Sequence, residues 1–334
     1  MRLTSNASGA PLTRLAHPKA FAAFLTTLGA PTERLFRSAG LPVYCEDPTA
    51  FVPVPSAWRL FHIAARSEDP TLGWQVGRYC GDRQLSRGLL KKLESASTLY
   101  QALHEFVALV RSEATHLELG IAEGRDAIYF HTEYSQLKDL PGYAESQAYQ
   151  LEVYVDLVRH YLGRRWHPPE IGIELPSVPR IAQEHFPGAR IRAGSRVGYI
   201  AIPRSVLHVG PPDDGAPEAD EDSLPSAAVR DYIGVVEEIV RAYMPDGYPS
   251  APQTAALMDT SVRTLRRRLR EHGVSYQSII DRVRFAEASR LLGDDSLRII
   301  DISHAVGFQA PAHFARMFRR VGGTSPREFR RTVG

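Results

Sequence analysis

The chain has 334 residues, 43% of them hydrophobic and 23% charged, a balance that is typical of a globular protein and excludes a disordered or fibrous chain. Its formal net charge of +2 is unevenly distributed: from Ala251 onward there are 15 arginines, no lysine and 8 acidic residues, a charge of +7, whereas the remainder has 25 basic and 30 acidic residues. A basic C-terminal part on an acidic body indicates binding to a polyanion such as nucleic acid, the alternative being an arginine-rich surface that only faces water.

The first residues and the cysteines indicate a cytoplasmic protein. The N-terminus has no apolar segment of the signal-peptide type before His17, and the chain has no run of 18 consecutive apolar residues. Cys45 and Cys80 are the only cysteines, too few for a disulfide framework. We therefore expect a protein of the reducing cytosol that does not associate with membranes.

Residues 15–208 are predicted to form a mixed α+β domain. Apolar periodicity predicts helices near residues 19–28, 56–65, 99–110 and 144–162. Two alternating segments, 115–121 and 127–131, flank a turn and predict a β-hairpin, with shorter strands expected at 170–175 and 197–202. A body of this size has a core large enough to enclose a small molecule.

The sequence does not assign effector-binding residues in this domain. Trp58, Trp74, Tyr149 and Tyr154 can line a ligand pocket, and ordinary core packing is the alternative for all four. We interpret Cys80 as a packed apolar residue, the alternative being a redox sensor.

No metal, cofactor or catalytic activity is expected. The pairs nearest to metal-ligand spacing are His104-Glu105, His116 with Glu118, and Glu184-His185, and none has a second histidine at i+4. The chain also lacks a Gly-x-Ser-x-Gly elbow, a phosphate-binding loop and a dinucleotide fingerprint. We therefore do not expect an enzyme.

Residues 209–226 are predicted to be a linker. This stretch is rich in proline, glycine and acidic residues and has almost no apolar side chain to bury. It separates the N-terminal domain from a second domain at 227–334.

A first two-helix unit is predicted after the linker. Ser250 and Gln253 form a capping box around Pro252, and a short helix runs from Gln253 to Met258. Asp259-Thr260 makes the turn, and Ser261 caps a second helix, 262–270. Apolar side chains of this helix recur at helical spacing, so the arginines between them are expected to point outward. Val262, Leu265 and Leu269 form that apolar face.

A second unit repeats this plan about 45 residues later, beyond a long amphipathic helix predicted at 275–292. Its first helix spans 299–306, Gly307 supplies a left-handed turn residue, and Phe308 is expected to be a buried anchor. Its second helix spans 311–320 and places Phe314, Met317 and Phe318 on the inner face. The long helix would act as a rigid spacer between the two units.

These stretches resemble the AraC/XylS family. The first unit is similar over Thr254–Leu257 and Ser261–Leu269, and the second over Ile302–Phe308, His313–Arg320 and Gly323–Arg330. More weakly, the N-terminal domain resembles the arabinose-binding-type effector domain of one subgroup. That likeness lies at Glu68–Gly73, Ser97–Leu103 and Arg165–Pro169.

The resemblance implies that the second helix of each unit enters the DNA major groove. Arg263, Arg266 and Arg267 would then read bases in the first unit, and His313 and Arg316 in the second, with Arg319 and Arg320 reaching phosphates. The complete predicted DNA-binding set is Arg263, Thr264, Arg266, Arg267, Arg270, Ala312, His313, Arg316, Arg319 and Arg320.

Three departures from the family pattern bear on this expectation. Asp259 stands at the usual turn glycine, where positive φ costs energy, and Ser303 stands at a usual alanine. The second reading helix starts with Ala310-Pro-Ala312, which leaves few polar groups there for direct readout.

The sequence therefore predicts a one-component transcription regulator. Its partners would be double-stranded DNA at two adjacent major-groove segments, a small-molecule effector that the resemblance implies, and RNA polymerase; a homodimer is left open. The effector, the target promoters and activation versus repression are not assigned. The alternative is an architectural DNA-binding protein whose N-terminal domain only mediates dimerisation.

Overall fold

The computed structural model describes residues 10–47, 49–67, 71–80, 85, 87–133, 137–211 and 231–333. They divide into two compact units. The N-terminal unit contains residues 11–41 and 51–211. The C-terminal unit contains residues 231–333 together with residue 10 and the short segments 42–47 and 49–50. Most of the predicted linker, 212–226, and the stretch 68–70 of the predicted family likeness lie outside the described residues.

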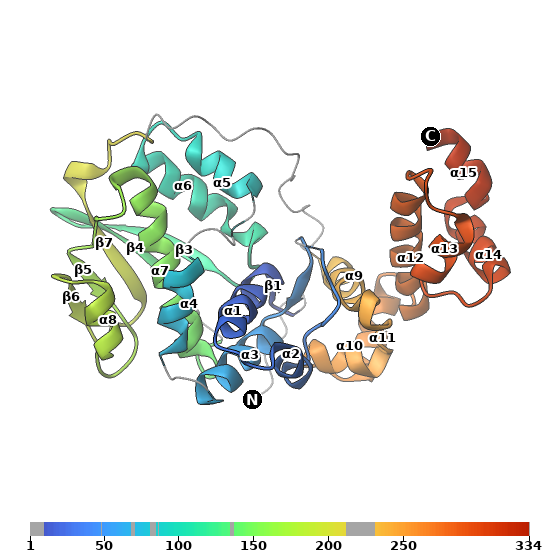
Figure 1. The fold of residues 1–334 in the computed structure, drawn as a ribbon, viewed down its shortest axis with the longest axis horizontal. Coiled ribbons are helices and arrows are strands. Elements are labelled where there is room, and N and C mark those ends of the chain that lie inside the picture. The colour runs from blue at the N-terminus through green and yellow to red at the C-terminus, as the bar shows by residue number, and fades with distance from the viewer. Residues whose placement is uncertain are drawn as a thin grey trace. The chain divides into compact units, whose positions relative to one another are not determined.

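The N-terminal unit is an α+β domain, as predicted (Figure 1). Its helices are α1 Ala16–Thr27, α2 Thr32–Ala39, α3 Val54–Ser67, α4 Leu72–Cys80, α5 Arg87–Glu94, α6 Leu99–Leu109, α7 Tyr143–Leu162 and α8 Arg180–His185, with 3₁₀ turns η1 Val110–Ser112 and η2 Arg204–Val206. The four predicted helices correspond to α1, α3, α6 and α7. The other four helices are short, with at most 9 residues each, so they offer few apolar repeats to a sequence pattern.

Two sheets complete this unit. Strands β1 Leu12–Arg14 and β2 Phe51–Pro53 pair antiparallel. The larger sheet has the order β3-β4-β7-β5-β6, in which only the β5–β6 pairing is parallel. Its strands are β3 Glu118–Glu123, β4 Ala127–Glu133, β5 Glu170–Gly172, β6 Arg190–Arg192 and β7 Gly198–Pro203.

The predicted hairpin is confirmed, although its first strand begins at Glu118 rather than at residue 115. Apolar and polar residues alternate along the strands because one face of the sheet is buried. On that face, the fully buried side chains include Ile128 and Phe130 of β4 and Ile200 and Ile202 of β7. The intervening Tyr129 and His131 are half-buried on the other face.

Helices α4 and α7 pack closely because α4 carries glycine at two successive turns. A Cβ atom added at Gly73 would lie 2.3 Å from the Glu145 carbonyl oxygen, and one added at Gly77 would lie 2.6 Å from Glu152 Cβ. Any larger residue at either position would push the helices apart.

The C-terminal unit is all-helical, as predicted, and runs from α9 to α15 (Figure 1). Its elements are α9 Tyr232–Tyr243, η4 Met244–Asp246, α10 Ala251–Leu257, α11 Val262–Glu271, α12 Tyr276–Leu292, α13 Ile299–Ala305, α14 Pro311–Gly322 and α15 Pro326–Val333. Within this unit, the Asp246 carboxylate accepts the backbone N–H groups of Val43 and Tyr44 at 3.0 and 3.1 Å. The long helix α12 connects the two predicted two-helix units.

The core of the second two-helix unit is formed jointly by α12, α13 and α14. Its buried members are Ala288, Leu292, Ile302, Val306, Phe314, Met317 and Phe318. Since α12 supplies part of this core, the spacer helix and the second unit are packed together rather than tethered.

Candidate DNA interface and ligand cavity

The first two-helix unit, α10 and α11, begins each helix with a side-chain cap. The Ser250 hydroxyl accepts the backbone N–H of Gln253, and the Gln253 side chain accepts the backbone N–H of Ser250 at 2.8 Å. The Ser261 hydroxyl caps α11 by accepting the Thr264 N–H at 3.1 Å. These predicted caps are confirmed, and they fix where the two helices start.

The turn between these helices uses aspartate in place of glycine. Asp259 has a φ of 49°, the one positive value of a non-glycine residue in the described part of the chain. Aspartate tolerates this region better than most residues because its short polar side chain can hydrogen-bond locally. The turn therefore forms without the family's usual glycine.

Helix α11 presents a row of arginines on its outer side. Leu265 and Leu269 are buried, and Val262 is half-buried. The predicted DNA-binding arginines of this helix are all exposed: Arg263, Arg266, Arg267 and Arg270. Thr264 is half-buried, with its hydroxyl 3.0 Å from that of Ser261.

These arginines differ in their partners. Arg263 and Arg266 form no ion pair with any described residue. Arg267 pairs with Glu271, one turn further along the same helix. Arg270 Nε donates to the Arg266 carbonyl oxygen at 3.3 Å. Arg263 and Arg266 are therefore the guanidinium groups of α11 that are most available to an external anion.

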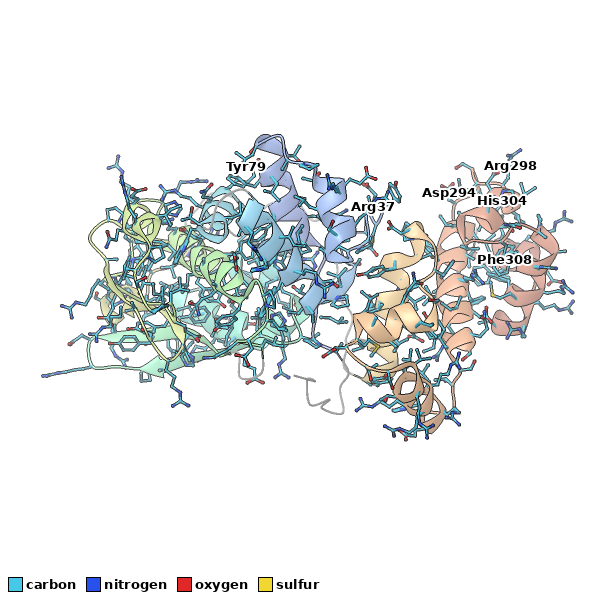
Figure 2. All side chains as sticks on the ribbon, turned by 90° about the horizontal axis from the view of Figure 1, so that it is seen from below. Arg37, Tyr79, Asp294, Arg298, His304 and Phe308 are labelled. Carbon is cyan, nitrogen blue, oxygen red and sulfur yellow. The ribbon has the colours of Figure 1, made fainter. Side chains whose placement is uncertain are left out.

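The second unit turns at Gly307, which has a φ of +80° as predicted. A Cβ atom there would lie 2.8 Å from the Tyr248 ring, so the position needs glycine for space as well as for conformation. Phe308, labelled in Figure 2, is half-buried rather than fully buried. Its ring packs 5.9 Å from that of Phe314, while its other side meets the Arg284 guanidinium at 4.5 Å.

Helix α14 buries the predicted inner face and exposes the predicted outer one. Phe314, Met317 and Phe318 are at most 5% exposed. The predicted contact residues Ala312, His313, Arg316, Arg319 and Arg320 are all exposed. Ala310 at the N-cap provides no side-chain hydrogen bond, and Pro311 occupies the first turn. The N-terminal end of α14 therefore has backbone N–H groups but few polar side chains.

Arg320 has a structural partner that the sequence did not predict. Its Nη2 lies 2.6 Å from Oδ2 of Asp281, a carboxylate on α12 that is only 5% exposed. Asp281 also accepts from Gln277 Nε2 at 3.1 Å. Arg320 thus joins α14 to α12, while its side chain remains 64% exposed. An acidic residue on the otherwise apolar face of α12 was the sequence signal for this pair.

Two further arginines of the basic region pack on aromatic rings. The Arg268 guanidinium lies 5.0 Å from the centre of the Tyr232 ring at the start of α9. Arg284 lies between Tyr248 and Phe308, at 4.3 and 4.5 Å. Both are cation–π arrangements, so part of the positive charge serves packing within the unit.

The N-terminal unit contains a cavity with an empty volume of about 530 Å³, part of which opens to solvent. Three of the four candidate aromatics, Trp58, Tyr149 and Tyr154, line it. Trp74 does not line it and instead packs edge-on against Phe186, with ring centres 6.1 Å apart. Apolar side chains form much of the wall, among them Phe61, Leu85, Phe106, Val110 and Val153.

A polar cluster forms another part of the cavity wall. Glu113, which is 1% exposed, accepts from Arg14 at 3.0 Å and lies 3.8 Å from His17 Nε2. His17 Nδ1 is 3.1 Å from the Tyr149 hydroxyl. Burial lowers the pKa of His17 to about 4, outweighing the opposite effect of Glu113, and lowers the pKa of His116 to about 3. Both imidazoles are therefore neutral near pH 7.

The described residues contain no group of three or more His, Cys, Asp and Glu side chains that could hold a metal ion. Cys45 and Cys80 are both buried. No described helix is long and apolar enough to span a membrane.

Comparisons with known proteins agree with this arrangement. Residues 29–209, more than half of the chain, match the family described as the arabinose-binding domain of AraC transcription regulators, N-terminal. Residues 254–332 match a helix-turn-helix domain family.

The curated relatives are similar in the C-terminal part. The HTH-type transcriptional regulator VqsM of Pseudomonas aeruginosa is 40% identical over 87 residues, 26% of this chain and 27% of that protein. The HTH-type transcriptional activator RhaS of Escherichia fergusonii is 36% identical over 93 residues, 27% of this chain and 34% of that protein. The matched segment thus spans about a quarter to a third of these relatives.

Among solved structures, the transcriptional regulator CdpR from Pseudomonas aeruginosa aligns over 94% of this chain and 97% of its own, with a TM-score of 0.40 and 18% identity. The two family matches are in the order and at the positions of the two units described above. The chain therefore belongs to the AraC/XylS family of transcription regulators, with an arabinose-binding-type N-terminal domain and a DNA-binding helix-turn-helix domain at its C-terminal end.

Proposed function

We propose that the chain is a one-component regulator that binds two adjacent major-groove segments of duplex DNA under the control of a small-molecule effector. The DNA-binding domain would be residues 227–334, the effector domain residues 15–208, and the linker residues 209–226. The observation that carries the proposal is the repeated unit: α11 and α14 each turn a buried apolar face inward and an exposed basic face outward.

Contact roles follow from the exposed faces. Arg263, Arg266 and Arg267 on α11, and His313 and Arg316 on α14, read base edges, because the fork of an arginine matches guanine O6 and N7. Thr264, Arg270, Ala312 and Arg319 flank these positions and contact the sugar-phosphate backbone. Arg320 reaches phosphate with the part of its side chain that its pairing with Asp281 leaves in water.

The cavity between the aromatic residues of the N-terminal unit is the proposed effector site. Its mixture of apolar wall and a few converging polar groups is typical of ligand sites in proteins. Effector binding would alter transcription through contact with RNA polymerase in the cytoplasm, as a monomer or homodimer.

DNA recognition can be tested with the full chain and a random duplex pool. Selection should enrich a sequence that is protected over two major-groove segments, with affinity falling at a log–log salt slope of about −0.9 per neutralised phosphate. Arg266→Ala should weaken the selected duplex, whereas Arg180→Ala, at an exposed arginine of the N-terminal unit, should not. Failure to enrich any sequence would contradict the proposal.

The second candidate function is an architectural DNA-binding protein whose N-terminal domain only dimerises. Small molecules that co-purify with the wild-type chain, identified by mass spectrometry, and that change its affinity for the selected duplex favour the regulator. A chain whose affinity for the duplex responds to none of them favours the architectural protein.

A further inference from the structure

Several polar groups on the wall of the N-terminal cavity already have partners within the protein. His17 is in contact with the Tyr149 hydroxyl, and the Tyr154 hydroxyl lies 2.5 Å from that of Thr132. A sugar carries a hydroxyl on nearly every carbon, and each hydroxyl that loses water on burial needs a partner. Since aromatic and aliphatic side chains form much of the remaining wall, a sugar would leave many of its hydroxyls unsatisfied.

The charges of the wall also restrict the ligand. Glu113 is the one charged side chain among the described residues that line the cavity, and its charge is balanced by buried Arg14 at 3.0 Å. An anionic ligand would approach this carboxylate with no described lysine or arginine on the wall to receive it. A cationic ligand would compete with Arg14 for Glu113, and separating a buried ion pair is costly.

We propose that this cavity takes an uncharged, mainly apolar small molecule with no more than one or two hydrogen-bonding groups, and that sugars, organic acids and amines are poor ligands. This inference rests on the proposed effector role of the cavity and specifies the chemical class of the effector. The aromatic rings of Trp58 and Phe106 supply the contact area, and the group of His17, Glu113 and Tyr149 supplies the polar contact.

The test uses the full chain and the uncharged fluorescent probe N-phenyl-1-naphthylamine. Saturable binding of about one probe per chain is expected, and indole should displace it. Indole-3-acetate, tryptamine and L-arabinose should each need at least tenfold higher concentrations than indole. No saturable binding, or displacement by the anion, the amine or the sugar at lower concentrations than indole, would overturn the proposal.

Two variants test whether the fluorescent probe binds in this cavity. Val153→Trp fills the buried wall and should abolish probe binding. Gln150→Lys places a cation on a half-exposed part of the wall and should make indole-3-acetate a better competitor than indole. If Val153→Trp does not fold, the order of the two competitors in Gln150→Lys alone tests whether the probe occupies this cavity. The control is Tyr79→Ala, at an aromatic residue that is 45% exposed on the surface of the N-terminal unit (Figure 2).

Failure of this inference differs from failure of the proposed function. If indole binds in the cavity but no cavity ligand changes affinity for the selected duplex, the ligand class holds and effector control fails. If an anion or a sugar binds there and changes DNA affinity, effector control holds and the ligand class is wrong.

Discussion

Arginine serves two purposes in the C-terminal unit, and its neighbours decide which. Arg268 and Arg284 pack on aromatic rings inside the unit. Arg263 and Arg266, by contrast, are exposed and form no ion pair with a described residue. A sequence count of charge does not separate these groups, because stacking partners such as Tyr232 and Tyr248 lie 36 residues away in both pairs.

We predict that Arg266→Ala and Arg316→Ala lower sequence specificity. Each would lose a bidentate base contact worth about 1–3 kcal/mol against the wrong base. Arg319→Ala, which removes a proposed phosphate contact, should weaken selected and random duplexes about equally. Competition binding measures the ratio of the two affinities. An unchanged ratio in both Arg266→Ala and Arg316→Ala would contradict the assigned base contacts.

Ser303 offers a prediction about stability. Its side chain is fully buried in α13, and its hydroxyl has no hydrogen-bond partner among the described residues. Ser303→Ala removes this unsatisfied group and should raise the free energy of unfolding by about 1 kcal/mol or more. Urea denaturation of the full chain measures this, with exposed Ser296→Ala as the control. A loss of stability in Ser303→Ala would show that the hydroxyl is satisfied in solution.

The two buried histidines should make the N-terminal unit sensitive to acid. The pKa of His17 is about 4 and that of His116 about 3 in the folded chain, both below the ordinary value of 6.5. The unfolded chain therefore binds more protons as pH falls below about 6.5, so stability decreases from there toward pH 4. His17→Gln should flatten this decrease in denaturation followed across pH, whereas exposed His104→Gln should not. If wild type and His17→Gln lost stability equally between pH 6.5 and pH 4, the low pKa of His17 would not be the cause of the acid sensitivity.

At the scale of elements, caps and turns could be predicted and inter-helix contacts could not. Ser250, Ser261 and Gly307 act locally, so their roles can be inferred from a few neighbouring residues. Helix α4 was not predicted because it has only 9 residues and the glycines at 73 and 77 interrupt its apolar pattern. The Asp281–Arg320 pair was not predicted because 39 residues separate its partners.

The Asp281–Arg320 pair should hold the second reading helix against the spacer helix. Arg320→Ala would leave the buried Asp281 carboxylate without its cation, so we expect about 1–3 kcal/mol lower stability. Arg319→Ala, at the exposed neighbour, should cost much less. Asp281→Asn with Arg320→Ala should recover part of the loss, because no buried charge then remains. Thermal and urea denaturation measure these effects, and equal stability of the two single arginine variants would contradict this role.

At the scale of the whole molecule, family, fold class and the order of the parts could be predicted from sequence. The cavity could be anticipated only in part, because Trp58, Tyr149 and Tyr154 line it and Trp74 does not. The lining comes from segments as distant as Thr13 and Tyr154, which only the fold brings together.

The central claim is that both two-helix units of the C-terminal part, α10–α11 and α13–α14, read DNA at a fixed separation. Helix α12 has 17 residues, which corresponds to about 26 Å at 1.5 Å per residue, and it shares a packed core with α13 and α14. Successive major grooves on one face recur about every 34 Å, or 10 base pairs. The spacer therefore permits simultaneous contact with two such grooves but no free adjustment between them.

The most direct test inserts about 5 base pairs between the two halves of the selected site, which turns the second groove to the opposite face of the duplex. We predict that the affinity of the full chain then falls to that of a duplex carrying one half-site, and that an insertion of about 10 base pairs does not restore it, since α12 cannot lengthen. Undiminished affinity for the 5-base-pair insertion would contradict the account, because it would mean that one helix-turn-helix unit does all the reading.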